Sequence, residues 1–320
     1  MSVFEPFEPF GDVEEIVGGL ASSDAVVRSL AVIELAETSN VQAVPYLAKA
    51  AGDVSADVRL QAARALGEFD GVEAAEALAR LVVDGDRNVA QAAGDSLGEL
   101  RDPAASAVLL PLVDHRSALV RAAIFQALKP FQVDASLGPA ITALGDDDAA
   151  VRVQAVGVIG YLKRAETIPS LIHAARDRDA YVRQAAVSAL SFARNDAAAQ
   201  AAADALVDPD WQVRAVAAET IGRIGLAGVA DALVAALGDG TWQVCQKALQ
   251  SLGKLKARDA VGAIIPFLED DFSSLRKEAA AALGDIADPA AHQALAARLD
   301  DDDPDVRKTV SWALTRIGIA

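Results

Sequence analysis

The sequence predicts an all-α solenoid, a right-handed superhelix of about ten helical hairpins stacked along one axis. A Val-Arg-like pair recurs every 31 residues without insertion, and its first residue, the anchor, is Val27, Val58, Val89, Val120, Val151, Val182, Val213, Val244, Leu275 or Val306. Apolar residues make up 52% of the chain, but aromatic residues only 5%. Ala, Val and Leu therefore supply most of the core, which favours closely packed helices.

Each anchor begins the apolar stripe of a first helix, which we name helix A. Positions four and eight residues after the anchor lie on the same helical face as the anchor. The first of these positions holds mostly Ala, from Ala31 to Val310, and the second holds Leu or Ile, from Leu35 to Leu314. The small side chain in the middle of the stripe predicts a close approach to a neighbouring helix.

The residues around this stripe predict where helix A begins and ends. Three residues before the anchor stands a side chain whose oxygen can cap a helix, namely Asp24, Ser55, Asp86, Ser117, Asp148, Asp179, Asp210, Thr241 or Asp303, and Phe272 breaks the series. Nine residues after the anchor stand Gly67, Gly98, Gly160, Gly222, Gly253 and Gly284. We expect these glycines to end helix A in the left-handed conformation.

A second apolar stripe follows in each unit and predicts helix B of a hairpin, for example Leu78 and Leu81 in the second repeat. Residues 13–20 fit this stripe one period early, so the array begins on a helix B and ends on a helix A. The expected organisation is a single solenoid over residues 13–320, preceded by a Phe- and Pro-rich segment at residues 1–12.

The repeats follow the motif D-x-x-V-R-x-x-A-x-x-x-L-G, and residues 148–160 and 210–222 are clear examples, with Ile at the Leu position. This motif resembles the short HEAT-like repeat typified by phycobilin lyase subunits. The resemblance implies stacked hairpins and a ladder between repeats, formed by aspartates and the arginines that follow the anchors: Arg28, Arg59, Arg121, Arg152, Arg183, Arg214, Arg276 and Arg307. Ala90 and Cys245 interrupt the arginine series and are expected to loosen the ladder locally.

The charge and composition limit the classes of partner. A net charge of -17 argues against binding of nucleic acid or of a membrane surface, because both rely on Lys and Arg. The acidic N-terminus and the absence of a long apolar run predict a cytoplasmic protein without a membrane span. A single cysteine excludes an intrachain disulfide and a Cys-based zinc site.

The sequence predicts no catalytic residue, no cofactor and no metal site. The motifs G-x-S-x-G, G-x-x-x-x-G-K-[ST], H-E-x-x-H and G-x-G-x-x-G are all absent. His115, His173 and His292 stand at different offsets from their anchors and so belong to different faces. Cys245 falls in the first turn of a helix without a histidine close in sequence, so we expect a buried or inert thiol.

Three scarce aromatic residues, Tyr181, Trp211 and Trp242, fall near the same turn of consecutive repeats and are the main candidates for partner binding. Other repeats mostly place small residues at the tryptophan position, so the core does not require a ring there. Trp and Tyr are enriched at interface hot spots. Partner contact and packing against the loop explain these residues equally well. His173 is a further candidate, expected on the exposed side of helix B.

The two ends of the array add candidates of their own. Phe4, Phe7 and Phe10 lie in the tandem sequence FEPFEPF, whose prolines prevent a helix. This segment either caps the first layer or binds another chain. At the other end, exposure of Trp312 would make an end-to-end homodimer an alternative to a monomer.

The function that these observations predict is a non-catalytic scaffold or adaptor. We expect it to bind a protein partner through the concave surface of its B helices and through the aromatic edge. The acidic turns suit a basic segment, and a smooth surface suits an extended or helical one. The alternative is a bilin-lyase-like or other cofactor attachment or maturation subunit.

Overall fold

The computed structural model describes residues 13–318, and every regular element in that range is a helix. Twenty α-helices, several flanked by short 3-10 turns, alternate between A and B helices. They fall into two compact units, one that ends at Leu162 and one that begins at Lys163. The predicted all-α stack of hairpins is confirmed.

In the first unit, each A helix is preceded by a shorter B helix. The A helices are α2 (Ala25–Glu37), α4 (Ala56–Leu66), α6 (Arg87–Leu97), α8 (Ala118–Leu128) and α10 (Ala149–Leu162). The B helices are α1 (Val13–Val17), α3 (Val44–Ala50), α5 (Val72–Leu81), α7 (Ser106–Leu109) and α9 (Leu137–Ala143).

The second unit repeats this arrangement. Its A helices are α12 (Ala180–Ala189), α14 (Trp211–Ile224), α16 (Trp242–Leu255), α18 (Ser273–Ile286) and α20 (Pro304–Ile317). Its B helices are α11 (Ile168–Ala174), α13 (Asp196–Asp204), α15 (Ala230–Ala236), α17 (Val261–Ile264) and α19 (His292–Ala296).

The predicted stripe of helix A forms the core of each unit. In α4, for example, Val58, Ala62 and Leu66 are all 0% exposed. Burial of one such leucine or valine contributes about 1.5–3 kcal/mol, and the stripe repeats in every layer. The first layer differs, because among the described residues only the short helix α1 and the turn after it precede α2, and Val27 and Leu30 of α2 are 41% and 52% exposed.

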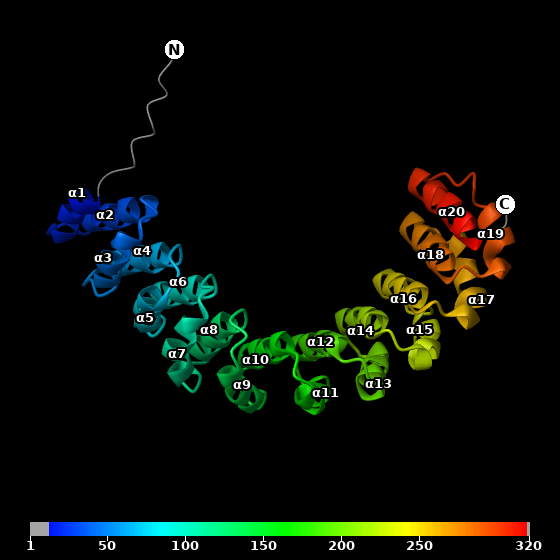
Figure 1. Cartoon of the computed structure of the whole chain (residues 1–320), viewed down its shortest axis with the longest axis horizontal. Coiled ribbons are helices and arrows are strands. Elements are labelled where there is room, and N and C mark those ends of the chain that lie inside the picture. The colour runs from blue at the N-terminus through cyan, green and yellow to red at the C-terminus, as the bar shows by residue number, and fades with distance from the viewer. Residues whose placement is uncertain (1–12, 319–320) are drawn as a thin grey trace, which may run out of the picture. The chain divides into compact units, whose positions relative to one another are not determined.

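Within each unit, the A helices form one row and the B helices form another (Figure 1). The A row follows the inner side of each unit's curve, and the B row follows the outer side. Some of the short B helices have a proline in their first turn, such as Pro45 in α3 and Pro169 in α11. The expectation that the B helices line the concave surface is therefore wrong. Small residues let the A helices pack closely, which places their row on the inside.

The glycines that were expected to end helix A have a different role. The structure gives none of them a left-handed conformation. Gly67 follows α4 with a right-handed φ of -68°, and Gly253 lies inside α16. A Cβ atom at Gly253 would stand 2.9 Å from the Cα atom of Ala282 in α18. Gly67, Gly222, Gly253 and Gly284 are needed for close approach of successive A helices and not for a turn.

The left-handed residue instead stands twelve residues after the anchor. The residues with positive φ at this position are Ser39, Gln132, Lys163, Gly225, Lys256, Ala287 and Gly318. Helix α14, for example, continues to Ile224 and ends at Gly225, with a φ of 77°. Most of these residues are not glycine, so composition gave no signal for this position.

The predicted caps are confirmed for aspartate but not for the hydroxyl side chains. Asp86 accepts hydrogen bonds from the backbone amides of Asn88 and Val89 at 2.8 and 3.3 Å. Ser55, Ser117 and Thr241 occupy the same position without a capping bond from the side chain. In the repeats that hold aspartate at this position, the first turn of helix A is capped by the aspartate side chain.

Close packing of the A helices predicts that Gly253→Ala destabilises the protein. The added methyl group would meet the backbone of α18, and overpacking of this kind costs about 1–3 kcal/mol. Gly262→Ala is the matched control, because no atom lies within 4 Å of a Cβ built at Gly262 in α17. That change should stabilise the helix by roughly 0.5–1 kcal/mol. Urea unfolding followed by circular dichroism measures both, and equal effects would contradict the packing role.

Candidate interaction edge

A ladder of arginine and aspartate side chains runs along the turns that precede the A helices. Nε and Nη2 of Arg59 donate to the two carboxylate oxygens of Asp84 at 2.7 and 3.0 Å. Nη1 of Arg59 donates to the backbone oxygen of Asp53 at 2.9 Å, and Asp53 pairs with Arg28 at 2.7 Å. Asp53 thus contacts the arginines of two successive repeats. The other pairs are Arg121–Asp146, Arg183–Asp208, Arg214–Asp239 and Arg276–Asp301.

The ladder aspartate stands two residues before the helix cap and orders the turn as well. Oδ1 of Asp84 accepts a hydrogen bond from the backbone amide of Asp86 at 2.8 Å. The Arg59 guanidinium beside Asp84 holds the pKa of that carboxyl below its usual range. Arg59 and Asp84 are 20% and 12% exposed, so water competes only in part for these bonds. The ladder therefore holds the turns at the start of each A helix in place.

The two interruptions of the ladder are built differently. Where Ala90 replaces arginine, the aspartate position 25 residues later holds His115, whose Nδ1 accepts from the backbone amide of Ser117 at 3.2 Å. Cys245 is buried, and its Sγ atom donates to the backbone oxygens of Leu237 and Asp239 at 3.3 Å each. Burial raises the pKa of this thiol. The neutral thiol thus replaces part of the arginine's contacts.

The three predicted aromatic residues lie at the first turns of consecutive A helices of the second unit, α12, α14 and α16. Tyr181, Trp211 and Trp242 are 68%, 41% and 39% exposed. A large part of each of these side chains therefore faces solvent. Together with Phe272, described next, we name these residues the aromatic edge.

Phe272 is a member of the aromatic edge that sequence reasoning missed. Its ring stacks on Trp242 with the centroids 6.2 Å apart and the planes at 27°. Phe272 is 55% exposed and occupies the cap position of α18. The sequence contained the signal, because an aromatic residue stands where every other repeat has a capping side chain.

The remaining predicted contacts are not brought to the aromatic edge. His173 is exposed on α11, as expected, and so belongs to the B row. Phe4, Phe7 and Phe10 lie outside the residues that the structure describes. Trp312 is 42% exposed on α20, and the Arg316 guanidinium lies 6.0 Å from its ring centroid.

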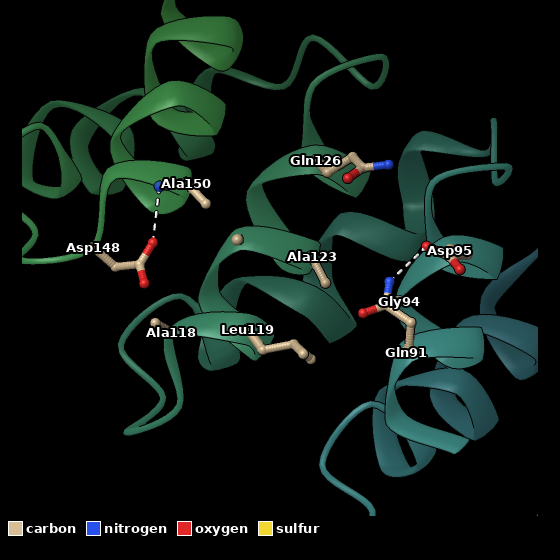
Figure 2. A pocket seen from close by; sticks show the side chains of 10 residues that line it. Gln91, Gly94, Asp95, Ala118, Leu119, Ala123, Gln126, Asp148 and Ala150 are labelled. Atoms are coloured by element: carbon tan, nitrogen blue, oxygen red, sulfur yellow. Dashed lines mark hydrogen bonds between the residues drawn. The ribbon is translucent and has the colours of Figure 1, made fainter. Parts of the chain in front are cut away.

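The inner surface of the first unit carries a groove between α6 and α8 (Figure 2). Its volume is about 310 Å³, and small residues such as Gly94 and Ala123 form part of its walls. Nε2 of Gln91 donates to Oδ1 of Asp95 at 2.9 Å on one side, and Gln126 lines the other. A second hollow, of about 440 Å³, lies between α4 and α6. Such amide and carboxylate groups can hydrogen-bond the backbone of a bound segment.

The described part of the chain lacks two kinds of feature. Residues 13–318 contain no group of three or more His, Cys, Asp or Glu side chains arranged to hold a metal ion. None of the helices in this range has the length and apolar character needed to cross a membrane.

Comparison with protein families gives a match over most of the chain. A family model described as HEAT repeats matches residues 13–86, 55–129, 137–222 and 230–315. None of the curated proteins compared with the chain matches it.

Solved structures share the fold at low sequence identity. An engineered protein is 21% identical, with a TM-score of 0.53 over 96% of this chain and 99% of its own. A structure of Kap95p with RanGDP is 14% identical, with a TM-score of 0.60 over 95% of this chain. The match covers 48% of that neighbour, so the chain spans about half of its length.

The ladder predicts that Asp84→Asn destabilises the protein by about 2 kcal/mol, because hydrogen bonds between charged groups are lost from a half-buried site. Asp204→Asn is the control. Its pair with Arg176 is 3.5 Å long, with side chains 49% and 72% exposed, and such a pair contributes about 0–1 kcal/mol. Urea unfolding gives both values. A loss at Asp84 no larger than at Asp204 would show that the ladder contributes little.

The ladder also predicts how stability depends on pH. The neighbouring arginines hold the pKa values of Asp53, Asp84, Asp146, Asp239 and Asp301 below the usual range. The unfolded chain has the higher pKa, roughly 3.9, so the ladder contributes fully at neutral pH and weakens as the pH falls below about 4.

The stability difference between wild type and Asp84→Asn should therefore be constant from about pH 7 to pH 5 and shrink below about pH 4. Urea unfolding at each pH measures it. A difference that stayed unchanged at about pH 3 would count against this account.

Proposed function

The chain belongs to the HEAT-repeat family, and on that premise we propose that it works as a non-catalytic protein-interaction scaffold or adaptor. Stacked hairpins present long surfaces to which many repeats contribute, which suits an extended or helical segment of another protein. The structural neighbour Kap95p is described as binding RanGDP, which supports a binding role for this architecture.

The observation that carries the proposal is the exposed aromatic edge. Trp211 and Trp242 leave 41% and 39% of their surfaces exposed at a position where other repeats hold small residues such as Ala56 and Ala149. Exposing rings of this size costs free energy unless a partner covers them. Partly buried Trp and Tyr residues are the usual anchors of protein interfaces.

The proposed partner also contacts the inner surface formed by the A helices. The grooves beside α6 offer Gln91 and Asp95 as hydrogen-bonding groups, which supports an extended or helical segment. The net charge of -17 favours a partner with a basic segment and does not favour nucleic acid or a membrane surface. The cytoplasmic setting expected from the sequence is part of the same proposal.

Further contacts are proposed at the ends of the array and on the B row. His173 is exposed and available to a partner that reaches α11. Val27 and Leu30 leave an apolar face of α2 exposed. We propose that either the Phe-rich segment covers this face as a cap or a second copy covers it in an end-to-end homodimer. With the cap in place, the protein would be a monomer. Phe4, Phe7 and Phe10 are the side chains proposed for this cap or for contact with another chain.

The alternative function is a bilin-lyase-like or other cofactor attachment or maturation subunit. The D-x-x-V-R repeat motif and the position of Cys245 beside Trp242 favour it. The burial of Cys245 and its raised pKa oppose a reactive thiolate. The test is to coexpress the protein with tetrapyrroles and record the visible spectrum after purification. A bound chromophore would support this alternative, and a colourless protein would weigh against it.

The scaffold proposal predicts that Trp211→Ala with Trp242→Ala removes a partner captured by the wild-type protein from a lysate of the source cells. Trp312→Ala is the control, because Trp312 is similarly exposed, at 42%, but lies outside the edge. Affinity purification with quantitative mass spectrometry measures each partner. We expect a loss of about tenfold or more, as for an interface hot spot. An unchanged partner list would reject the aromatic edge as the binding site.

A further inference from the structure

Three departures from the repeat meet at one boundary, between α16 and α18. Trp242 stands where most repeats have a small residue, Cys245 stands where most have arginine, and Phe272 stands where the others have a capping side chain. Trp242 precedes Cys245 by three residues, so the two lie one helical turn apart on the same side of α16. Phe272 stacks on Trp242 across the boundary.

The aspartate that completes the ladder elsewhere is still present at this boundary. Asp270 stands 25 residues after Cys245, as Asp239 stands 25 residues after Arg214. Its Oδ1 accepts from the backbone amide of Phe272 at 2.9 Å, and its backbone oxygen accepts from Nη1 of Arg276 at 2.9 Å. Asp270 therefore keeps the backbone geometry of a ladder aspartate.

The carboxylate of Asp270 differs from the other ladder aspartates in its partner. Each of the six aspartates in the described ladder pairs with a guanidinium at 2.6–2.8 Å. Among residues 13–318, no cationic side chain forms an ion pair with Asp270. The Cys245 thiol is neutral and donates to backbone oxygens, so it does not balance this charge.

The stacked rings beside Asp270 suit the same kind of ligand. A guanidinium binds a carboxylate through a planar fork and also stacks on an aromatic face. Trp242 and Phe272 are 39% and 55% exposed, so their surfaces are accessible. Ring stacking alone explains why these two residues touch, but it leaves the Asp270 carboxylate without a cation.

We propose that this boundary binds an arginine side chain of the protein partner, which completes the interrupted ladder. Its guanidinium pairs with the carboxylate of Asp270, and its planar face packs against the rings of Trp242 and Phe272. Lysine lacks the planar fork and should bind more weakly. The inference rests on the proposed scaffold function and adds the chemistry of one contact.

The test uses the full chain with Trp211→Phe and Trp312→Phe, so that Trp242 is its one tryptophan. The probes are short glycine-flanked peptides that contain one arginine, one lysine or one citrulline. Trp242 fluorescence is recorded as each peptide is titrated. The arginine peptide should bind about tenfold more tightly than the citrulline peptide, which lacks the charge. Equal responses to the arginine and citrulline peptides would overturn the proposal.

Cys245→Arg is the decisive variant, because the new side chain would pair with Asp270 within the chain and block the site. We expect it to raise the dissociation constant of the arginine peptide about tenfold while the melting temperature stays the same or rises. Gln293→Arg adds the same charge at an exposed position on α19 and should bind like the parent protein. Tight binding by Cys245→Arg would overturn the proposal.

Asp270→Asn keeps the test conclusive if Cys245→Arg does not fold. This variant removes the carboxylate without adding bulk and should weaken binding of the arginine peptide equally.

Capture of the partner by the same variants separates this inference from the scaffold function. If Trp242→Ala loses the partner while Cys245→Arg and Asp270→Asn retain it, the aromatic edge binds the partner without an arginine at Asp270. The scaffold proposal would then stand, and the arginine site would be rejected.

Discussion

Close contact between successive A helices is the constraint on which the rest of the structure depends. The contact requires small residues at fixed places, and Gly253 against Ala282 shows how little room remains. It places the A row on the inner side of each unit and aligns the turns between repeats. Only with the turns aligned can each arginine reach the aspartate 25 residues later, so the ladder follows from the packing of the helices.

Periodicity predicted the helices and their buried stripe because both depend on local spacing alone. Periodicity failed where one residue type can serve either of two structural roles. A glycine such as Gly253 serves equally well as a left-handed stop or as a point of close approach, and only the neighbouring helix distinguishes the two. Which row lies on the inner side is likewise a property of packing between repeats. The ladder itself was implied by resemblance, but its acceptor lies two residues before the predicted cap.

The candidate site was partly visible in the sequence because it consists of exceptions to the repeat. Trp211 and Trp242 stood out against small residues at the same position. Phe272 and Asp270 did not, since one resembled a lost cap and the other resembled every other ladder aspartate. The significance of Asp270 appears only when its missing counterion is seen beside a stacked aromatic pair. In a regular array, positions that break the pattern together mark function better than any single residue.

The stack of Trp242 on Phe272 also makes one boundary respond differently to ionic strength. Dissolved salt screens charge pairs, although arginine–aspartate pairs as little exposed as those at the neighbouring boundaries are screened less than surface pairs. Contact between aromatic rings is apolar and gains from salts that favour burial of apolar surface. The boundary between α16 and α18 should therefore depend less on ionic strength than the neighbouring boundaries, which an arginine–aspartate pair bridges.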